Sequence, residues 1–170
     1  MESLEKIIQE RRPKKEILEY LHINNLWDEL PNLLFNEDAH LSWRATWLLS
    51  LADGPIVQAL NLDPHRLITH GKKCPSSQKR EILRLLEKLE IPEALLGTYF
   101  DWALEMWTDL KLKSSLRVTA LQAMSRVGKL FPELNREIME LNIPELLNPL
   151  TPAIKKQAVR IFQTVSKKIV

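Results

Sequence analysis

Residues 43–48 read Trp-Arg-Ala-Thr-Trp-Leu, and a related phrase recurs three more times along the chain. The other copies are Gln-Lys-Arg-Glu-Ile-Leu at 78–83, Leu-Arg-Val-Thr-Ala-Leu at 116–121 and Ile-Lys-Lys-Gln-Ala-Val at 154–159. The second residue is always basic, the fifth and sixth are apolar, and successive copies are 35, 38 and 38 residues apart. A period in this range indicates helical repeats, which bury their apolar faces by stacking on their neighbours.

Each phrase lies in a segment with the apolar periodicity of a helix. In the last copy the apolar residues fall at 154, 158, 161, 162, 165 and 169, which is one stripe at 3.6 residues per turn. Asp38, Ser76, Ser114 and Thr151 precede the copies and have side chains suited to helix N-caps. Further helical segments at about 25–35, 64–72, 92–110 and 132–147 separate the copies. Each repeat is therefore predicted to be a first helix followed by a second helix that carries the phrase.

Composition agrees with an all-α chain. The 170 residues are 45% hydrophobic and 27% charged, with only four glycines and no long run of alternating apolar and polar residues. We expect one domain over residues 1–170, in which capping helices at 1–24 cover the end of a repeat array at 25–170.

Several classes of function find no support in the sequence. The net charge of +2 does not by itself indicate a polyanion partner, and the single cysteine, Cys74, fits a reducing compartment. Neither a secretory signal nor an apolar run of about 20 residues is present, so we expect a cytoplasmic protein without a membrane partner. There is no phosphate-binding glycine loop or nucleophile motif, so we expect no catalysis and no cofactor. His65, His70 and Cys74 lack a fourth ligand and the spacing of a metal site, so we expect no metal.

The repeated pattern resembles the HEAT repeat, a relative of the armadillo repeat. The best match runs from Leu-Pro-Asn-Leu-Leu-Phe-Asn-Glu-Asp at 30–38 into the phrase at 43–48, and Leu-Leu-Asn-Pro-Leu at 146–150 leads similarly into the phrase at 154–159. The resemblance implies a right-handed α–α superhelix of about four helix pairs, with second helices on the concave side. It also implies a structural role for the repeated cation, which is Arg44, Lys79, Arg117 or Lys155 in successive copies.

Charge is distributed unevenly between the two kinds of helix. Residues 76–91, 114–131 and 152–170 sum to +9, whereas 92–110 and 132–148 sum to −7. Aligning the second helices places cations at equivalent positions, and we call six of these the basic ladder: Arg80, Arg84, Lys88, Arg126, Lys156 and Arg160. One interpretation is that salt bridges between layers neutralise the charges, each contributing little at the surface. The other is a concave groove that binds an acidic peptide or a nucleic-acid backbone.

The segment at 99–109 has an unusual composition. Asp101 and Glu105 lie four residues apart, and Trp102 and Trp107 flank them. A pocket of carboxylates and aromatic rings is one interpretation, since HEAT-like DNA glycosylases place an aspartate beside tryptophans. We favour the simpler interpretation, in which the tryptophans pack inward and the carboxylates face water. The Trp43–Trp47 pair is likewise expected to pack within the stack, with a partner-binding anchor as the alternative.

These observations together predict a non-catalytic scaffold or adaptor whose partner is a protein or peptide, with an acidic partner as one candidate. The alternative is a nucleic-acid-binding or base-repair module that uses the basic ladder and the Asp101–Trp107 segment. A homodimer formed through the last repeat is a third hypothesis, because that repeat ends in an amphipathic helix.

Overall fold

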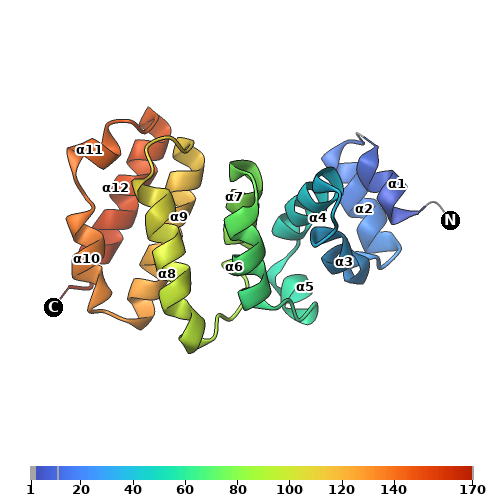
Figure 1. Cartoon of the computed structure of the whole chain (residues 1–170), viewed down its shortest axis with the longest axis horizontal. Helices are drawn as coiled ribbons and strands as arrows, with labels where there is room; N and C mark the ends of the chain where they lie inside the picture. The colour runs from blue at the N-terminus through green and yellow to red at the C-terminus, as the bar shows by residue number, and fades with distance from the viewer. Residues whose placement is uncertain (1–2, 11, 170) are drawn as a thin grey trace.

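The computed structural model describes residues 3–10 and 12–169, and every regular element in these ranges is a helix, as predicted. The helices form a row along the long axis of the molecule, with the chain termini at its opposite ends (Figure 1). In chain order the elements are α1 (Leu4–Gln9), α2 (Lys14–Ile23), the 3-10 helix η1 (Trp27–Glu29), α3 (Leu30–Leu34), α4 (Ala39–Leu51), α5 (Gly54–Ala59), α6 (Pro64–Lys73), α7 (Ser76–Leu86), α8 (Glu93–Thr108), α9 (Ser114–Leu130), α10 (Leu134–Glu140), α11 (Pro144–Leu147) and α12 (Pro152–Ser166).

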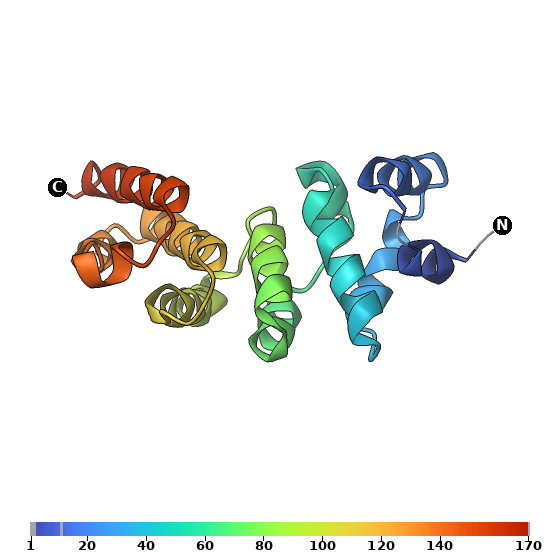
Figure 2. The same ribbon diagram turned by 90° about the horizontal axis from the view of Figure 1, so that it is seen from above.

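The recurring phrase lies in α4, α7, α9 and α12, which we call the second helices. Each packs against a preceding first helix: α3 on α4, α6 on α7, α8 on α9, and α10 on both α9 and α12. The second helices also contact one another in chain order. Seen from above, the row bows, and α9 (gold) and α12 (red) lie on the side toward which its ends turn (Figure 2).

Polar side chains cap some helices, but not all of those predicted. Asp38 accepts hydrogen bonds from two backbone N–H groups in the first turn of α4, as expected of an N-cap. The N-cap prediction was wrong for Ser76 and Ser114, which are already the first residues of α7 and α9. Pro75 occupies the position before α7 in an extended conformation, so the helix begins directly after it. Thr151 lies at the N-cap of α12, but its side chain makes no capping bond.

A continuous apolar core runs through the row from α1 to α12. Aromatic side chains are its largest members, and the ring of Trp107 in α8 meets that of Phe162 in α12 edge to face at 5.9 Å. Two glycines allow helices to approach closely. A Cβ atom at Gly71 would lie 2.5 Å from the Trp102 ring, and one at Gly128 would lie 2.4 Å from Asn135 Oδ1. Because glycine has no side chain, α6 can pack closely on α8 at Gly71, and α9 can pack closely on α10 at Gly128.

The interface between α4 and α7 is polar at its centre. Ser42, Thr46 and Ser50 of α4 face Gln78 and Glu81 of α7, and all five are buried. Gln78 Nε2 donates to Ser42 Oγ (2.9 Å) and to Thr46 Oγ1 (3.1 Å), while the Ser50 hydroxyl donates to Glu81 Oε2 (2.6 Å). We call these five residues the polar seam. Its hydrogen bonds satisfy polar groups that would otherwise destabilise the fold.

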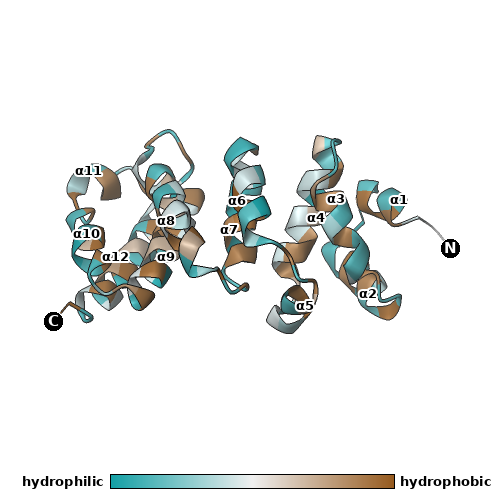
Figure 3. Cartoon of the chain, turned by 60° about the horizontal axis from the view of Figure 1, so that its bottom comes forward, coloured by the Kyte–Doolittle hydropathy of each residue, from teal (hydrophilic) through white to brown (hydrophobic). Residues whose placement is uncertain are grey.

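The interface between α9 and α12 is apolar instead. Every buried residue of α12 is apolar (Ala158, Ile161, Phe162 and Val165), and most buried residues of α9 are apolar too, among them Ala120, Ala123, Met124 and Val127. In Figure 3 the brown, hydrophobic segments of α8, α9 and α12 gather in this part of the row. Two interfaces at equivalent places in the repeat are therefore held by different chemistry.

Candidate partner-binding surface

The repeated cation of the phrase is a structural residue in two of its copies. Arg117 is 1% exposed, and its Nε and Nη2 atoms donate to the carbonyl oxygens of Trp107 (2.9 Å) and Leu146 (2.7 Å). Its burial lowers the pKa of the guanidinium, and Asp109 partly offsets this effect. Arg44 donates from Nε to the carbonyl oxygen of Ile8 at 3.2 Å. These bonds join separate helices, so both side chains hold the stack together.

Two members of the basic ladder are paired with a buried carboxylate. Arg80 Nη2 lies 2.8 Å from Glu81 Oε1, and Arg84 Nη1 lies 3.2 Å from Glu81 Oε2. The Glu81 side chain is 2% exposed, whereas the two arginine side chains are 41% and 44% exposed. Because one carboxylate faces two guanidinium groups, this cluster keeps a net positive charge. Its arginines are nevertheless oriented by Glu81 rather than free.

Two further members bind the carboxyl-terminal ends of preceding second helices. Lys88 Nζ donates to the carbonyl oxygens of Ser50 (2.5 Å) and Ala52 (2.7 Å) at the end of α4. Arg126 makes the equivalent bonds at the end of α7, to the carbonyl oxygens of residues 86 (2.6 Å) and 89 (2.5 Å). A cation at this position pairs with carbonyls that lack helical partners and with the negative end of the helix dipole. Lys88 and Arg126 are therefore half-buried capping residues.

The last two members of the ladder are exposed on α12. Lys156 and Arg160 lie one turn apart, and neither side chain makes a hydrogen bond or ion pair with any residue in the described ranges. A shallow depression of about 530 Å³ runs beside them, and its lining residues are Pro152, Lys155, Lys156, Val159, Arg160 and Gln163. Lys155 at its edge donates to Asn148 Oδ1 at 2.9 Å. Of the six predicted ladder residues, these two have the most freedom to meet a partner.

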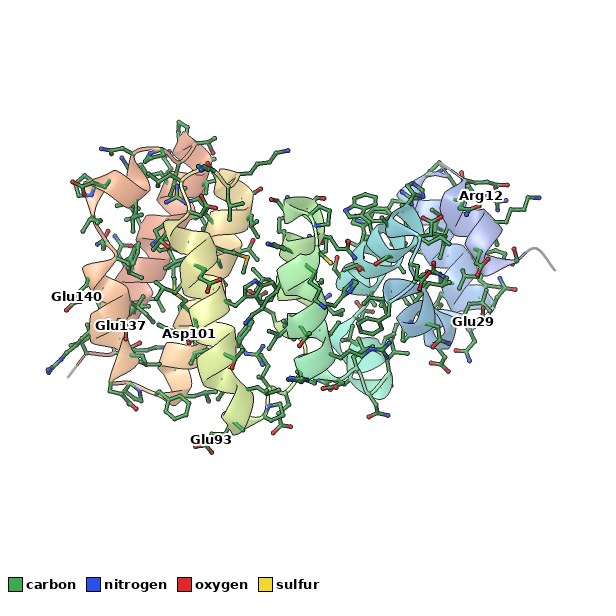
Figure 4. All side chains as sticks on the ribbon, viewed as in Figure 1. Arg12, Glu29, Glu93, Asp101, Glu137 and Glu140 are labelled. Atoms are coloured by element: carbon green, nitrogen blue, oxygen red, sulfur yellow. The ribbon has the colours of Figure 1, made fainter. Side chains whose placement is uncertain are left out.

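Among residues 3–10 and 12–169, ion pairs do not join the acidic first helices α8 and α10 to the basic second helices α9 and α12. Figure 4 labels Glu93, Asp101, Glu137 and Glu140 on the α8 and α10 side, and all four are exposed. The interpretation based on salt bridges between layers is thus unsupported in this half of the row.

The acidic and aromatic residues of α8 do not share a pocket. Trp102 is 2% exposed and packs against Gly71 of α6, while Trp107 is 0% exposed and lies 5.1 Å from the guanidinium carbon of Arg117. Asp101 and Glu105 lie on the opposite, exposed side of the helix. The core takes both indole rings because large aromatic side chains bury the most apolar surface. A base-binding arrangement of these four side chains is therefore absent.

Trp43 and Trp47 are half-buried on α4, with nearly parallel rings (3°) whose centroids are 6.3 Å apart. The Arg44 guanidinium carbon lies 5.0 Å from the Trp47 ring centroid. These contacts place the pair within the α4 packing, beside the arginine that reaches α1.

The candidate metal residues are separated by their roles in packing. His70 Nε2 lies 3.3 Å from Ser42 Oγ and 3.4 Å from Gln78 Nε2, so it belongs to the edge of the polar seam. Burial lowers the pKa of His70, with Arg66 and Lys73 adding to the effect. Burial raises the pKa of Cys74 to about 11. Across the described ranges, no three histidine, cysteine or acidic side chains are grouped so that they could hold a metal ion.

The polar seam was missed by the sequence analysis, although a signal for it exists. Ser42, Thr46 and Ser50 follow one another at intervals of four, which places a polar stripe on one face of an otherwise apolar helix. Such a stripe faces either water or polar partners on a neighbouring helix. The sequence shows the stripe but does not show which face of α4 is covered.

The architecture and the repeated cation define a helical repeat protein. A sequence model of the HEAT repeat domain matches residues 2–165, so the chain belongs to the HEAT repeat family. No curated protein and no solved structure matches it. None of the helices in the described ranges has the length and apolar character needed to cross a membrane.

Proposed function

We propose that this protein is a non-catalytic scaffold that binds another macromolecule on the side formed by its second helices. HEAT repeats generally mediate protein interactions, which supports a protein or peptide partner. The separation of charge is the single observation that carries the proposal. Residues 111–131 and 146–170 contain no aspartate or glutamate, and no ion pair from α8 or α10 reaches α9 or α12 among the described residues. A surface segment that carries only positive side chains attracts an acidic partner over distances of about 10 Å.

The proposed surface is not uniform along the row. Lys88 and Arg126 cap helices, and Arg80 and Arg84 pair with Glu81. These four residues therefore add to the positive electrostatic potential of the surface, but their side chains are not free to bind a partner. Toward α12 the cations are exposed and unpaired within the described ranges. We therefore place the docking surface mainly on α12.

The finer architecture is part of the same proposal. We propose a right-handed superhelix of about four helix pairs, with residues 1–24 as a cap within one domain. The bow of the row, with α9 and α12 on its inner side, supports a concave docking face (Figure 2). The single cysteine supports a cytoplasmic location. Self-association through α12 is the competing use of the same helix, and a molar mass measured by light scattering distinguishes it.

Binding of model ligands tests the proposed function directly. Fluorescence anisotropy with a labelled poly-glutamate peptide should show binding at about 50 mM salt that weakens steeply as salt is raised. A poly-lysine peptide of the same length is the matched control and should not bind. Equal binding of both peptides, or binding of neither, would contradict the proposal. Single-stranded DNA in the same assay tests the other partner class, because tighter binding of DNA than of peptide would identify a nucleic-acid scaffold.

A further inference from the structure

The exposed edge of α12 carries positive side chains in one line. Lys156, Arg160 and Lys167 are spaced by four and seven residues, so they follow one side of the helix and its end over about 16 Å. All three are exposed, and none has an ion-pair partner in the described ranges. The opposite side of α12 is fully used, since Ala158, Ile161, Phe162 and Val165 are buried in the core.

Comparison with α9 shows why these cations are not needed by the fold. Arg126 of α9 caps α7, and the aligned position in α12 is Thr164, which instead donates to the Arg160 carbonyl oxygen at 3.0 Å. Among the residues that the structure describes, the capping bond that Arg126 makes to the end of α7 therefore has no equivalent at the interface between α9 and α12. Lys156 and Arg160 lie at other positions on α12, and neither side chain bonds to a neighbouring helix in the described ranges.

An apolar element lies among these charges. Val159 is half-buried and Pro152 is exposed, and both line the depression beside Lys156 and Arg160. An apolar surface flanked by cations is suited to bind an amphipathic helix, whose anchor residues recur at intervals of three and four.

We propose that this face of α12 docks an acidic amphipathic helix of a partner protein. Carboxylates of the partner, spaced by four and seven residues, pair with Lys156, Arg160 and Lys167, and an apolar side chain between them rests on Val159 and Pro152. The assignment builds on the proposed function and specifies its ligand and position.

Charge on the neighbouring helices favours a short acidic helix over a nucleic-acid backbone. Proteins that bind DNA through its backbone make about 6–10 phosphate contacts along an extended track. Here the track is interrupted beyond α9, because Glu87 and Glu90 are exposed at the end of α7. A polyanion that followed the second helices would meet these carboxylates, whereas a peptide confined to α12 does not.

A designed peptide provides the test. The probe is a labelled helical peptide of about 16 residues, with glutamates at the spacing of the three cations and a leucine between them. A second peptide of the same composition distributes its glutamates around the helix. Fluorescence anisotropy should show at least about tenfold tighter binding of the patterned peptide, which corresponds to about 1.4 kcal/mol.

Variants locate the binding site on the molecule. The Lys156→Glu/Arg160→Glu double variant should weaken binding of the patterned peptide by about tenfold or more. Lys14→Glu/Lys72→Glu is the matched control, because it changes the net charge equally at two exposed positions on α2 and α6, and it should bind within about twofold of the wild type. Val159→Ser leaves the charge unchanged and should weaken binding by about threefold. Circular dichroism confirms that each variant is folded.

The possible outcomes distinguish failure of the α12 assignment from failure of the proposed function. If the wild type binds acidic peptides but the α12 double variant binds them equally well, the α12 assignment is overturned and the proposed function stands. If the wild type binds no acidic ligand at low salt, both are overturned. If the wild type is a dimer that the double variant dissociates, a second copy of the chain occupies this face instead. Tighter binding of single-stranded DNA than of the patterned peptide likewise overturns the peptide assignment.

Discussion

The interface between α4 and α7 and the interface between α9 and α12 occupy equivalent places in the repeat, yet they use opposite chemistry. The first has five polar side chains at its centre, with Lys88 bonded to the end of α4. The second is lined by alanine, methionine, valine, isoleucine and phenylalanine. The buried residues of α12 are all apolar, and neither Lys156 nor Arg160 bonds to a neighbouring helix in the described ranges, so these two cations are not needed for stacking. The comparison indicates that one repeated sequence pattern can supply both structural cations, such as Arg126 of α9, and exposed cations, such as Arg160 of α12.

Truncating the apolar interface should have the largest effect. Phe162→Ala removes a ring that is 1% exposed and contacts Trp107, so the free energy of unfolding should fall by about 3–5 kcal/mol. Urea denaturation followed by circular dichroism measures the change.

For the polar interface, Gln78→Ala leaves Ser42 and Thr46 without their hydrogen-bond donor and should lower the free energy of unfolding by about 1–3 kcal/mol. A larger loss for Gln78→Ala than for Phe162→Ala would reverse the comparison.

The contact between α6 and α8 links the two halves and depends on a missing side chain. Gly71→Ala places a methyl group 2.5 Å from the Trp102 ring, which must shift, so we expect a loss of about 1–3 kcal/mol. Gly97→Ala in α8 is the control. Its new Cβ meets nothing within 4 Å, and alanine should raise the free energy of unfolding by about 0.5–1 kcal/mol. Thermal melts of both variants decide the matter, and stabilisation by Gly71→Ala would refute the close packing described here.

Removing a capping cation should weaken the polar interface moderately. Lys88→Met keeps much of the side-chain length but loses the bonds to the Ser50 and Ala52 carbonyl oxygens, so the expected loss is about 1 kcal/mol. Lys72→Met changes an exposed lysine of α6 and should stay within about 0.5 kcal/mol of the wild type. Equal denaturation midpoints for the two variants would show that Lys88 does not support the stack.

Lowering the pH should destabilise the polar interface through His70. Its folded-state pKa is lowered, first by burial and then by Arg66 and Lys73, so the unfolded chain binds the proton more readily. The contribution of His70 is therefore most favourable above its unfolded pKa of about 6.5 and is lost as the pH falls toward the lower folded-state pKa. Urea midpoints across this range should fall less in His70→Gln than in the wild type. An identical pH dependence in both proteins would exclude His70 as the cause.

Much of the fold was predictable because it depends on local periodicity. The stripe at residues 154–169 and the spacing of the phrase led to the all-helical class and the second helices, which the structure contains. The inward packing of Trp102 and Trp107 also followed from their size and helical spacing. The serine cap predicted for α7 did not follow, because Pro75 fixes the local backbone and the helix begins directly after it at Ser76.

The candidate surface was less predictable, since the sequence does not show which groups a long basic side chain contacts. Arg126 and Arg160 look alike as exposed-face arginines, but the first touches carbonyls of a neighbouring helix 37–40 residues earlier. The polar seam was hidden for the same reason. Contacts between repeats depend on the angle at which helices stack, and no local pattern specifies that angle.

The most direct test of a division between structural and exposed cations measures stability and binding on one pair of variants. Arg126→Met should lower the free energy of unfolding by about 1–2 kcal/mol and leave binding of the patterned acidic peptide within about threefold of the wild type. Arg160→Met should leave stability within about 0.5 kcal/mol and weaken that binding by about fivefold. The predicted result is a loss of stability in Arg126→Met and a loss of peptide binding in Arg160→Met. Loss of stability in Arg160→Met with binding unchanged, or equal losses of both properties in the two variants, would contradict the account.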